Sequence, residues 1–349
     1  MSALPYLNIV GDVATVGLCL TLSINSFLIY LTHTHIEGIK GAYKYMILLV
    51  ANLGILFSSM EKVLHPFMHN YNISFVFFTI SPVFGASKLV KTLLLLAYSV
   101  VYLLIICINT FQFIYRYLII HQSKLVNCFQ GRRAVWMLVY LIFFSAVWVF
   151  FPMHCLPDDY SISYLKTEML SRYNDSSDQV AGFFSVAYEL TGSTRNWRRH
   201  AVMGAISLGA ILFIQCTIIL FCGIKIHQKI EEMMTLTSKR DHRLQSQLFK
   251  TLVLQITAPS IFYHTPALFL FLAPFLDMEI SVPSGVMVCF FSIYPALDSL
   301  ILMWFVTEYH LVIGKLMEKF FERAMTWARS FSNRAADKDN DQVDNGDNN

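Results

Sequence analysis

Long apolar blocks separated by short polar segments dominate the chain. Seven of these blocks approach or exceed the roughly 20 residues that a helix needs to cross a bilayer. A helix satisfies its own backbone polar groups, and the hydrocarbon offers them no other partner. The pattern therefore predicts seven transmembrane helices, at residues 9–32, 42–65, 92–115, 134–151, 201–224, 251–276 and 280–307.

The third block is the clearest span. Residues 92–115 carry no formal charge, and Lys91 and Arg116 bracket them. Cations at both ends of an apolar stretch are typical of a membrane helix whose charged side chains reach the headgroups. In the sixth block, Pro259 and Pro266 predict kinks rather than a break in the helix.

Composition agrees with a membrane protein. Hydrophobic residues make up 56% of the 349 residues and charged residues only 14%, against about 25% in soluble domains. The net charge of +3 gives no indication of nucleic-acid binding. We expect an all-α membrane protein in which residues 1–310 form one seven-transmembrane bundle.

The distribution of cations predicts the orientation. With the N-terminus outside, 18 of the 26 Lys and Arg residues fall in the cytoplasm, which agrees with the positive-inside rule. The sequons at Asn72 and Asn174 then both lie outside, where N-glycosylation takes place. Such tripeptides also arise by chance, so they support the orientation without fixing it.

Polar residues follow one face of the third span toward its inner end. Helical spacing places Asn109, Gln112 and Arg116 on that face, and Tyr115 and Tyr117 flank the arginine. Asn109 and Gln112 could serve only as interhelical hydrogen-bonding groups. Arg116 is either a simple membrane anchor or a switch that pairs with an acid in one state and contacts a G protein in another.

Asp298 is the one acid well inside the seventh span. Burying it in the bilayer costs several kcal/mol unless it is paired, hydrated or neutral, so it is a functional candidate. It follows Tyr294 and Pro295, and the proline weakens the helix where an inward motion would need a hinge. The alternative is a structural kink beside a satisfied acid.

The C-terminal part has two different patterns. Residues 311–332 repeat apolar side chains at helical spacing, with Lys315, Lys319 and Arg323 between them. This pattern predicts an amphipathic helix on the inner leaflet, in contact with lipid. Residues 333–349 are rich in Asp and Asn, so we expect a disordered tail.

Three stretches resemble the Str class of nematode seven-transmembrane serpentine chemoreceptors. Residues 291–302 (Phe-Ser-Ile-Tyr-Pro-Ala-Leu-Asp-Ser-Leu-Ile-Leu), with Thr-Glu-Tyr-His at 307–310, resemble the family's seventh-helix signature. Residues 113–118 and 247–255 resemble its third-helix ending and the start of its sixth helix. Ser299 stands where the family usually has a proline, and His310 stands where it usually has an arginine. These two differences concern the strength of coupling to the G protein.

The resemblance implies a G protein-coupled receptor for an odorant-like or pheromone-like small molecule, with a heterotrimeric G protein as its partner. It also implies the plasma membrane of sensory cilia, and no cofactor. In such a receptor the ligand binds between the outer halves of the helices. Our candidates there are Tyr98, Tyr102, Tyr263 and His264, whose aromatic walls suit small, weakly polar ligands. Ordinary interhelical packing would explain the same residues.

Two other classes are less well supported. An intramembrane enzyme would need paired acids or a metal cluster at one depth. Asp298 and His264 lie near opposite ends of their spans, and His33 and His35 have no third ligand nearby in sequence. A transporter or ligand-gated channel remains an alternative, but it would favour an inverted repeat or a row of intramembrane charges, and neither is visible.

Overall fold

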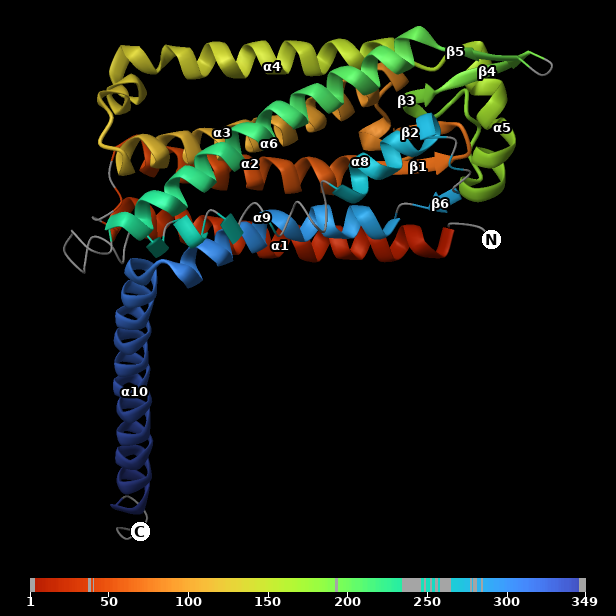
Figure 1. Ribbon diagram of the computed structural model, residues 1–349. Helices are drawn as coiled ribbons and strands as arrows, with labels where there is room; N and C mark the ends of the chain where they lie inside the picture. The colour runs from red at the N-terminus through yellow and green to blue at the C-terminus, as the bar shows by residue number, and fades with distance from the viewer. Residues whose placement is uncertain are drawn as a thin grey trace.

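The computed structural model is a bundle of long helices with a small β-roof at one end and a projecting helix at the other (Figure 1). The description covers residues 4–36, 39, 41–191, 194–233, 246–247, 249–251, 253–254, 257, 265–276, 278, 281–283 and 285–344.

Seven helices run along the bundle: α1 (Leu4–Thr34), α2 (Ala42–Leu64), α3 (Lys88–Ile120), α4 (Val135–His154), α6 (Arg199–Met233), α8 (Thr265–Leu272) and α9 (Gly285–Phe305). Each overlaps one of the seven predicted spans, and α8 covers only residues 265–272 of the sixth. Five of them are long and apolar enough to cross a membrane alone, and α9 with the helix after it forms a sixth candidate. Most of the first half of the predicted sixth span, with Pro259, lies outside the described residues.

Several helices are longer than their apolar blocks. The third helix extends beyond residues 92–115 at both ends, because the helical backbone continues past the cations that mark the limits of the hydrocarbon. The seventh is shorter than expected, since a strand at Ser281–Pro283 precedes it. In the sixth, Pro266 lies within α8.

Glycines allow close approach among α1, α2 and α9. A Cβ added at Gly17 would lie 2.5 Å from the carbonyl oxygen of Ser292, and one at Gly54 would lie 3.0 Å from the Cβ of Pro295. Small residues of this kind let membrane helices pack backbone to backbone. As a result, α9 is held against both α1 and α2.

The roof is the largest departure from the expected all-helical pattern. Residues 153–200, between the fourth and fifth predicted spans, contain α5 (Asp159–Tyr173) and the strands β3 (Ala181–Val186), β4 (Tyr188–Thr191) and β5 (Thr194–Trp197). Strand β3 joins β1 (Phe67–Tyr71), β2 (Ser74–Thr79) and β6 (Ser281–Pro283) in an antiparallel sheet of order β3-β2-β1-β6, and β4 pairs with β5. We call this end of the bundle the roofed end.

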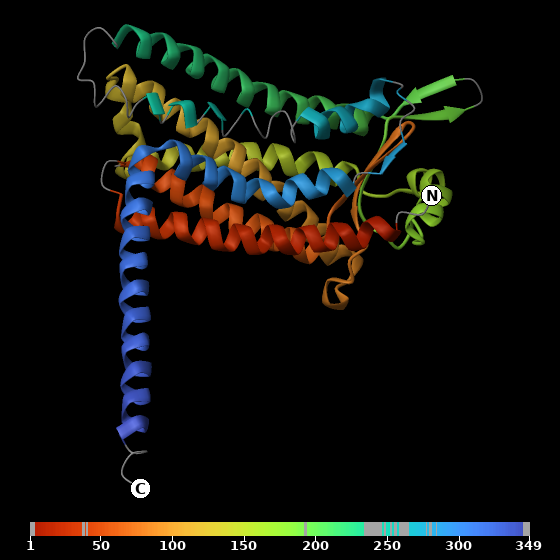
Figure 2. The same cartoon turned by 90° about the horizontal axis from the view of Figure 1, so that it is seen from below.

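At the opposite end the chain turns sharply at Val306. Helices α9 and α10 (Thr307–Asp344) meet there at 89°, and α10 leaves the bundle perpendicular to its long axis (Figure 2). We call this the elbow end. The amphipathic helix begins earlier than residue 311 and continues through most of the stretch expected to be disordered, with no break before Asp344. The Asp- and Asn-rich sequence did not stop the helix because it contains no glycine or proline before that point.

Candidate functional site

A cavity of about 160 Å³ lies directly under the roof. Strands β1, β2 and β3 cover it, and α3, α4, α6, α8 and α9 contribute its walls. It is lined by Met68, Phe75, Phe77, Tyr98, Ser99, Tyr102, Val147, Trp148, Pro152, Cys155, Phe183, Ser185, Ser207, Leu208, Ile211, Leu212, Leu268, Phe271 and Phe291. An apolar cavity of about 150 Å³ is large enough to hold benzene in another protein, so this one can hold a small organic molecule.

Two of the four predicted pocket residues line this cavity. Tyr98 and Tyr102 lie one turn apart on α3. The ring of Tyr98 stacks on Phe57 of α2, with ring centroids 4.5 Å apart, and Tyr102 packs against Trp148 of α4. The other two candidates, Tyr263 and His264, lie outside the described residues.

The cavity wall is apolar, with a few hydroxyl groups. Trp148 donates its Nε1–H to Ser99, 3.2 Å away. The Tyr98 hydroxyl is buried, and no described residue offers it a hydrogen-bond partner. No Asp, Glu, Lys, Arg or His side chain belongs to the described lining. The cavity is therefore suited to an uncharged molecule, and a polar atom of that molecule could satisfy Tyr98.

Strand β1, one of the two inner strands of the roof sheet, contacts the cavity on one face and α5 on the other. On β1, Met68 lines the cavity and Asn70 donates to the carbonyl oxygen of Leu270 in α8. His69, between them, points to the opposite face and contacts α5, because strand side chains alternate. Its Nε2 lies 3.2 Å from Glu168 and its Nδ1 lies 3.2 Å from the hydroxyl of Tyr173.

The imidazole of His69 is completely buried, and this burial lowers its pKa. Burial lowers the pKa of His69 to about 4, although the Glu168 carboxylate opposes this shift. That carboxylate is also in an ion pair with Arg172, whose positive charge disfavours protonation of the imidazole. The roof is therefore built around a neutral histidine.

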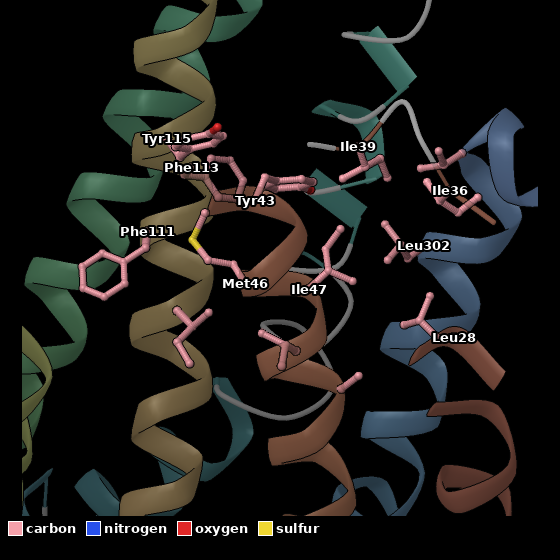
Figure 3. Close-up of a cluster of buried hydrophobic side chains, with 14 of the residues drawn as sticks. Leu28, Ile36, Ile39, Tyr43, Met46, Ile47, Phe111, Phe113, Tyr115 and Leu302 are labelled. Atoms are coloured by element: carbon pink, nitrogen blue, oxygen red, sulfur yellow. The ribbon is translucent and has the colours of Figure 1, made fainter. Parts of the chain in front are cut away.

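Near the elbow end, Arg116 is buried rather than extended toward headgroups. Only 5% of its surface is exposed, and its guanidinium lies 3.7 Å from the ring centroid of Tyr43 at the start of α2. Figure 3 shows Tyr43 beside Tyr115, whose ring is stacked nearly parallel to it with centroids 6.3 Å apart. A plain membrane anchor would not be enclosed in this way.

Asp298 is also buried near this end, at 6% exposure. Tyr43 interacts electrostatically with both Arg116 and Asp298, so the tyrosine lies close to both predicted charges. Beside Asp298 is a very small cavity, about 10 Å³, whose polar walls are Asp298, Gln112 and Ser299. That volume is at the lower limit for one water molecule.

The other predicted coupling residues have separate surroundings. Tyr294 interacts through its hydroxyl with Asn109 of α3. Pro295 packs near Gly54, and α9 passes through it as a continuous helix. Tyr117 contacts Phe221 of α6, with ring centroids 6.0 Å apart. It also packs against the hydrophobic cluster that contains Tyr43 and Tyr115.

Sequence reasoning missed three buried residues. Tyr43 stands at the end of a span, where a tyrosine is an ordinary interfacial residue. Tyr309 is buried at the start of α10, and its hydroxyl lies 2.8 Å from that of Thr32 in α1. Glu61 is an acid within the second apolar block, and that position was itself a signal.

Both sequons lie at the roofed end. Asn72 is in the tight turn between β1 and β2, and Asn174 ends α5. Both have positive φ, 46° and 54°, a conformation that asparagine tolerates better than most residues. Asn174 is exposed, whereas Asn72 is partly buried.

Comparisons with known proteins agree with one another. A family model described as serpentine type 7TM GPCR chemoreceptor Str matches residues 11–314. G-protein coupled receptor str-33 of Caenorhabditis elegans is 41% identical over 296 residues, which cover 84% of this chain and 86% of the relative. Serpentine receptor class r-10 of the same species is 25% identical, over 90% and 92% of the two chains.

The crystal structure of squid rhodopsin is similar in fold. It superposes with a TM-score of 0.57 and 16% sequence identity, covering 90% of this chain and 81% of rhodopsin. At that identity the likeness concerns the seven-transmembrane architecture alone, while the family match covers most of the chain. The chain therefore belongs to the Str family of serpentine seven-transmembrane chemoreceptors, which are G protein-coupled receptors and not enzymes.

Proposed function

We propose that this receptor detects a small, uncharged, mostly apolar molecule of the odorant or pheromone type in the cavity under the roof. The observation that carries the proposal is the buried hydroxyl of Tyr98, which has no partner among the described residues and stands in the wall of an otherwise apolar cavity. A ligand oxygen or nitrogen would satisfy it, and the aromatic walls would bury the rest of the molecule.

The roofed end faces outward in this proposal, with the N-terminus outside the cell. The surplus of cations at the elbow end supports this orientation, and Asn72 and Asn174 would then be glycosylation sites. In the same orientation, α10 lies along the inner leaflet. Its exposed Leu311, Met317 and Phe320 would meet lipid there. The sensory cilium is the expected location.

Arg116, Tyr43 and Asp298 form the coupling site in this account. They join α3, α2 and α9, the last of which leads directly into the elbow. Ligand binding would shift the population toward an arrangement in which Arg116, Tyr115, Tyr117, Tyr294 and Pro295 become available to a heterotrimeric G protein. Such a shift requires that the ligand bind one arrangement more tightly than the other.

The test is a cell line with a G-protein readout, screened with a panel of volatile and small polar compounds. Wild type would be compared with Tyr98→Phe, which removes only the hydroxyl, and with Tyr45→Phe as a control on an exposed tyrosine. We expect a response that Tyr98→Phe weakens about tenfold in potency, close to the 1.4 kcal/mol of one hydrogen bond. Arg116→Ala and Asp298→Ala should abolish the response at equal surface expression. A response that all three variants retain would contradict the proposal.

A further inference from the structure

Glu61 is a carboxyl group enclosed by the bundle near its roofed end. It lies in the last turn of α2 and is only 1% exposed. Ser292 of α9 donates its hydroxyl to Oε1 over 2.5 Å. Among the described residues, no hydrogen-bond partner reaches the other oxygen, Oε2. Half of this buried acid is therefore unsatisfied within the described structure.

The charged and titratable groups around Glu61 do not compensate a negative charge. Lys62, the next residue, points to α1 and donates to Thr15 and to the carbonyl oxygen of Gly11. His65 borders the same surface groove as Lys62, outside the bundle. From α3, Tyr98 is the titratable group that interacts electrostatically with Glu61, and α9 contributes the neutral Ser292. No ion pair joins Glu61 to any described Lys, Arg or His.

An ionised Glu61 would face three penalties at this place. A carboxylate without a cation inside the membrane costs several kcal/mol. The last turn of a helix carries the negative end of its dipole, which repels an anion. One serine hydroxyl satisfies one oxygen only. A neutral acid leaves at most one weakly polar group unpaired, which costs about 1–3 kcal/mol.

We propose that Glu61 is a proton-binding site, and that its carboxyl group carries a proton in the arrangement described here. The proton makes the contact between α2 and α9 possible, because it allows the acid to sit against Ser292 without a counter-ion. Its loss would convert the carboxylic acid into a carboxylate and transfer the proton to water at the roofed end. The resulting anion would require water to enter or α9 to move away.

The position links this site to both parts of the receptor. On one side, Tyr98 forms part of the cavity wall. On the other, Ser292 lies three residues before Pro295, on the helix that leads to Asp298 and the elbow. The functional meaning of the proton rests on the proposed ligand cavity. The presence of the proton is independent of that cavity, and it can be measured without ligand or G protein.

The experiment is infrared spectroscopy of the purified full-length receptor in lipid nanodiscs, in D2O buffer at neutral pD. Protonated and ionised carboxyl groups absorb in separate regions. We expect the difference between wild type and Glu61→Gln to show the loss of a protonated carboxyl band. Glu168→Gln is the matched control, since Glu168 is paired with Arg172 in the roof, and it should show the loss of a carboxylate band instead.

A second variant covers the case in which Glu61→Gln does not fold. Ser292→Ala keeps the acid but removes its donor, so the protonated carboxyl band should move to higher frequency. A carboxylate band that disappears in Glu61→Gln, as in Glu168→Gln, would overturn the proposal. So would a Ser292→Ala spectrum in which the protonated carboxyl region is the same as in wild type.

Discussion

The two ends of the bundle differ in how much space and how much charge they enclose. Under the roof, aromatic rings surround about 160 Å³ of space, and no Asp, Glu, Lys, Arg or His lines the described wall. Near the elbow, the buried Arg116 lies over the ring of Tyr43, and only about 10 Å³ of space lies beside the buried Asp298. One end has room and no charge, and the other has charge and no room. This contrast fits a ligand site at the roof and a switch at the elbow.

Removing the buried cation should have the largest effect. In Arg116→Ala, Tyr43 loses its cation–π partner, and the buried Asp298 loses a positive charge close to the same tyrosine. We expect the loss of this compensation to cost about 3–5 kcal/mol. We expect a melting temperature several degrees lower and no G-protein response. Asp298→Asn in the same chain should restore part of the stability. Lys124→Ala, an exposed cation at the same end, is the control. Strictly additive effects of Arg116→Ala and Asp298→Asn would show that the two charges are not coupled.

Acid should weaken the roof through His69. The folded pKa of about 4 lies below the value of about 6.5 in an unfolded chain, so the unfolded state binds the proton first as pH falls. Stability should be constant above pH 7 and should decrease between pH 6.5 and 4, by roughly 3 kcal/mol in total. Thermal unfolding of the purified receptor across this range is the measurement. His69→Gln should flatten the profile. An unchanged slope in this variant would assign the effect to other groups.

A methyl group added on β3 should reduce folding and surface expression more than one added on a helix below the roof. A Cβ at Gly182 would lie 2.4 Å from the carbonyl oxygen of Phe77 on β2, a backbone atom that cannot rotate away. Gly182→Ala should therefore cost about 1–3 kcal/mol and reduce surface expression. Gly209→Ala, on α6, meets no atom within 4 Å and should leave expression unchanged. Equal expression of the two variants would mean that the roof is not needed for folding.

The elbow should respond most weakly. The hydroxyl pair of Thr32 and Tyr309 fixes the start of α10 against α1. Tyr309→Phe removes one hydrogen bond, worth about 1 kcal/mol. We expect a small decrease in melting temperature and a reduced maximal response, with the potency of the ligand unchanged. A change in potency alone would place the effect in the ligand site instead.

The transmembrane helices could be predicted because each follows from a local property. Twenty apolar residues must form a helix in hydrocarbon whatever surrounds them. The roof depends on distant pairs, since β2 at residues 74–79 pairs with β3 at 181–186. Nothing in either segment alone specifies that register, so the sequence did not predict the sheet.

The candidate site divides in the same way. Arg116 and Asp298 could be predicted because a charge in an apolar block is conspicuous. Tyr43 could not, because its role arises from the stacking of Arg116 over its ring. Glu61 was within reach of the same reasoning as Asp298. Glu61 stands next to Lys62 near the end of its span, where charged residues commonly reach the headgroups. The two side chains nevertheless point in different directions.

The most direct test of whether the ligand binds under the roof is to fill the cavity with a larger side chain. Ser207 lines it from α6, and Ser207→Phe would occupy much of the 160 Å³. The measurement is the dose response of a G-protein readout to an active compound, beside Phe213→Leu on the exposed face of α6. We predict at least a tenfold loss of potency in Ser207→Phe, with surface expression and the response of Phe213→Leu unchanged. A Ser207→Phe receptor that responds like wild type would show that the ligand does not bind under the roof.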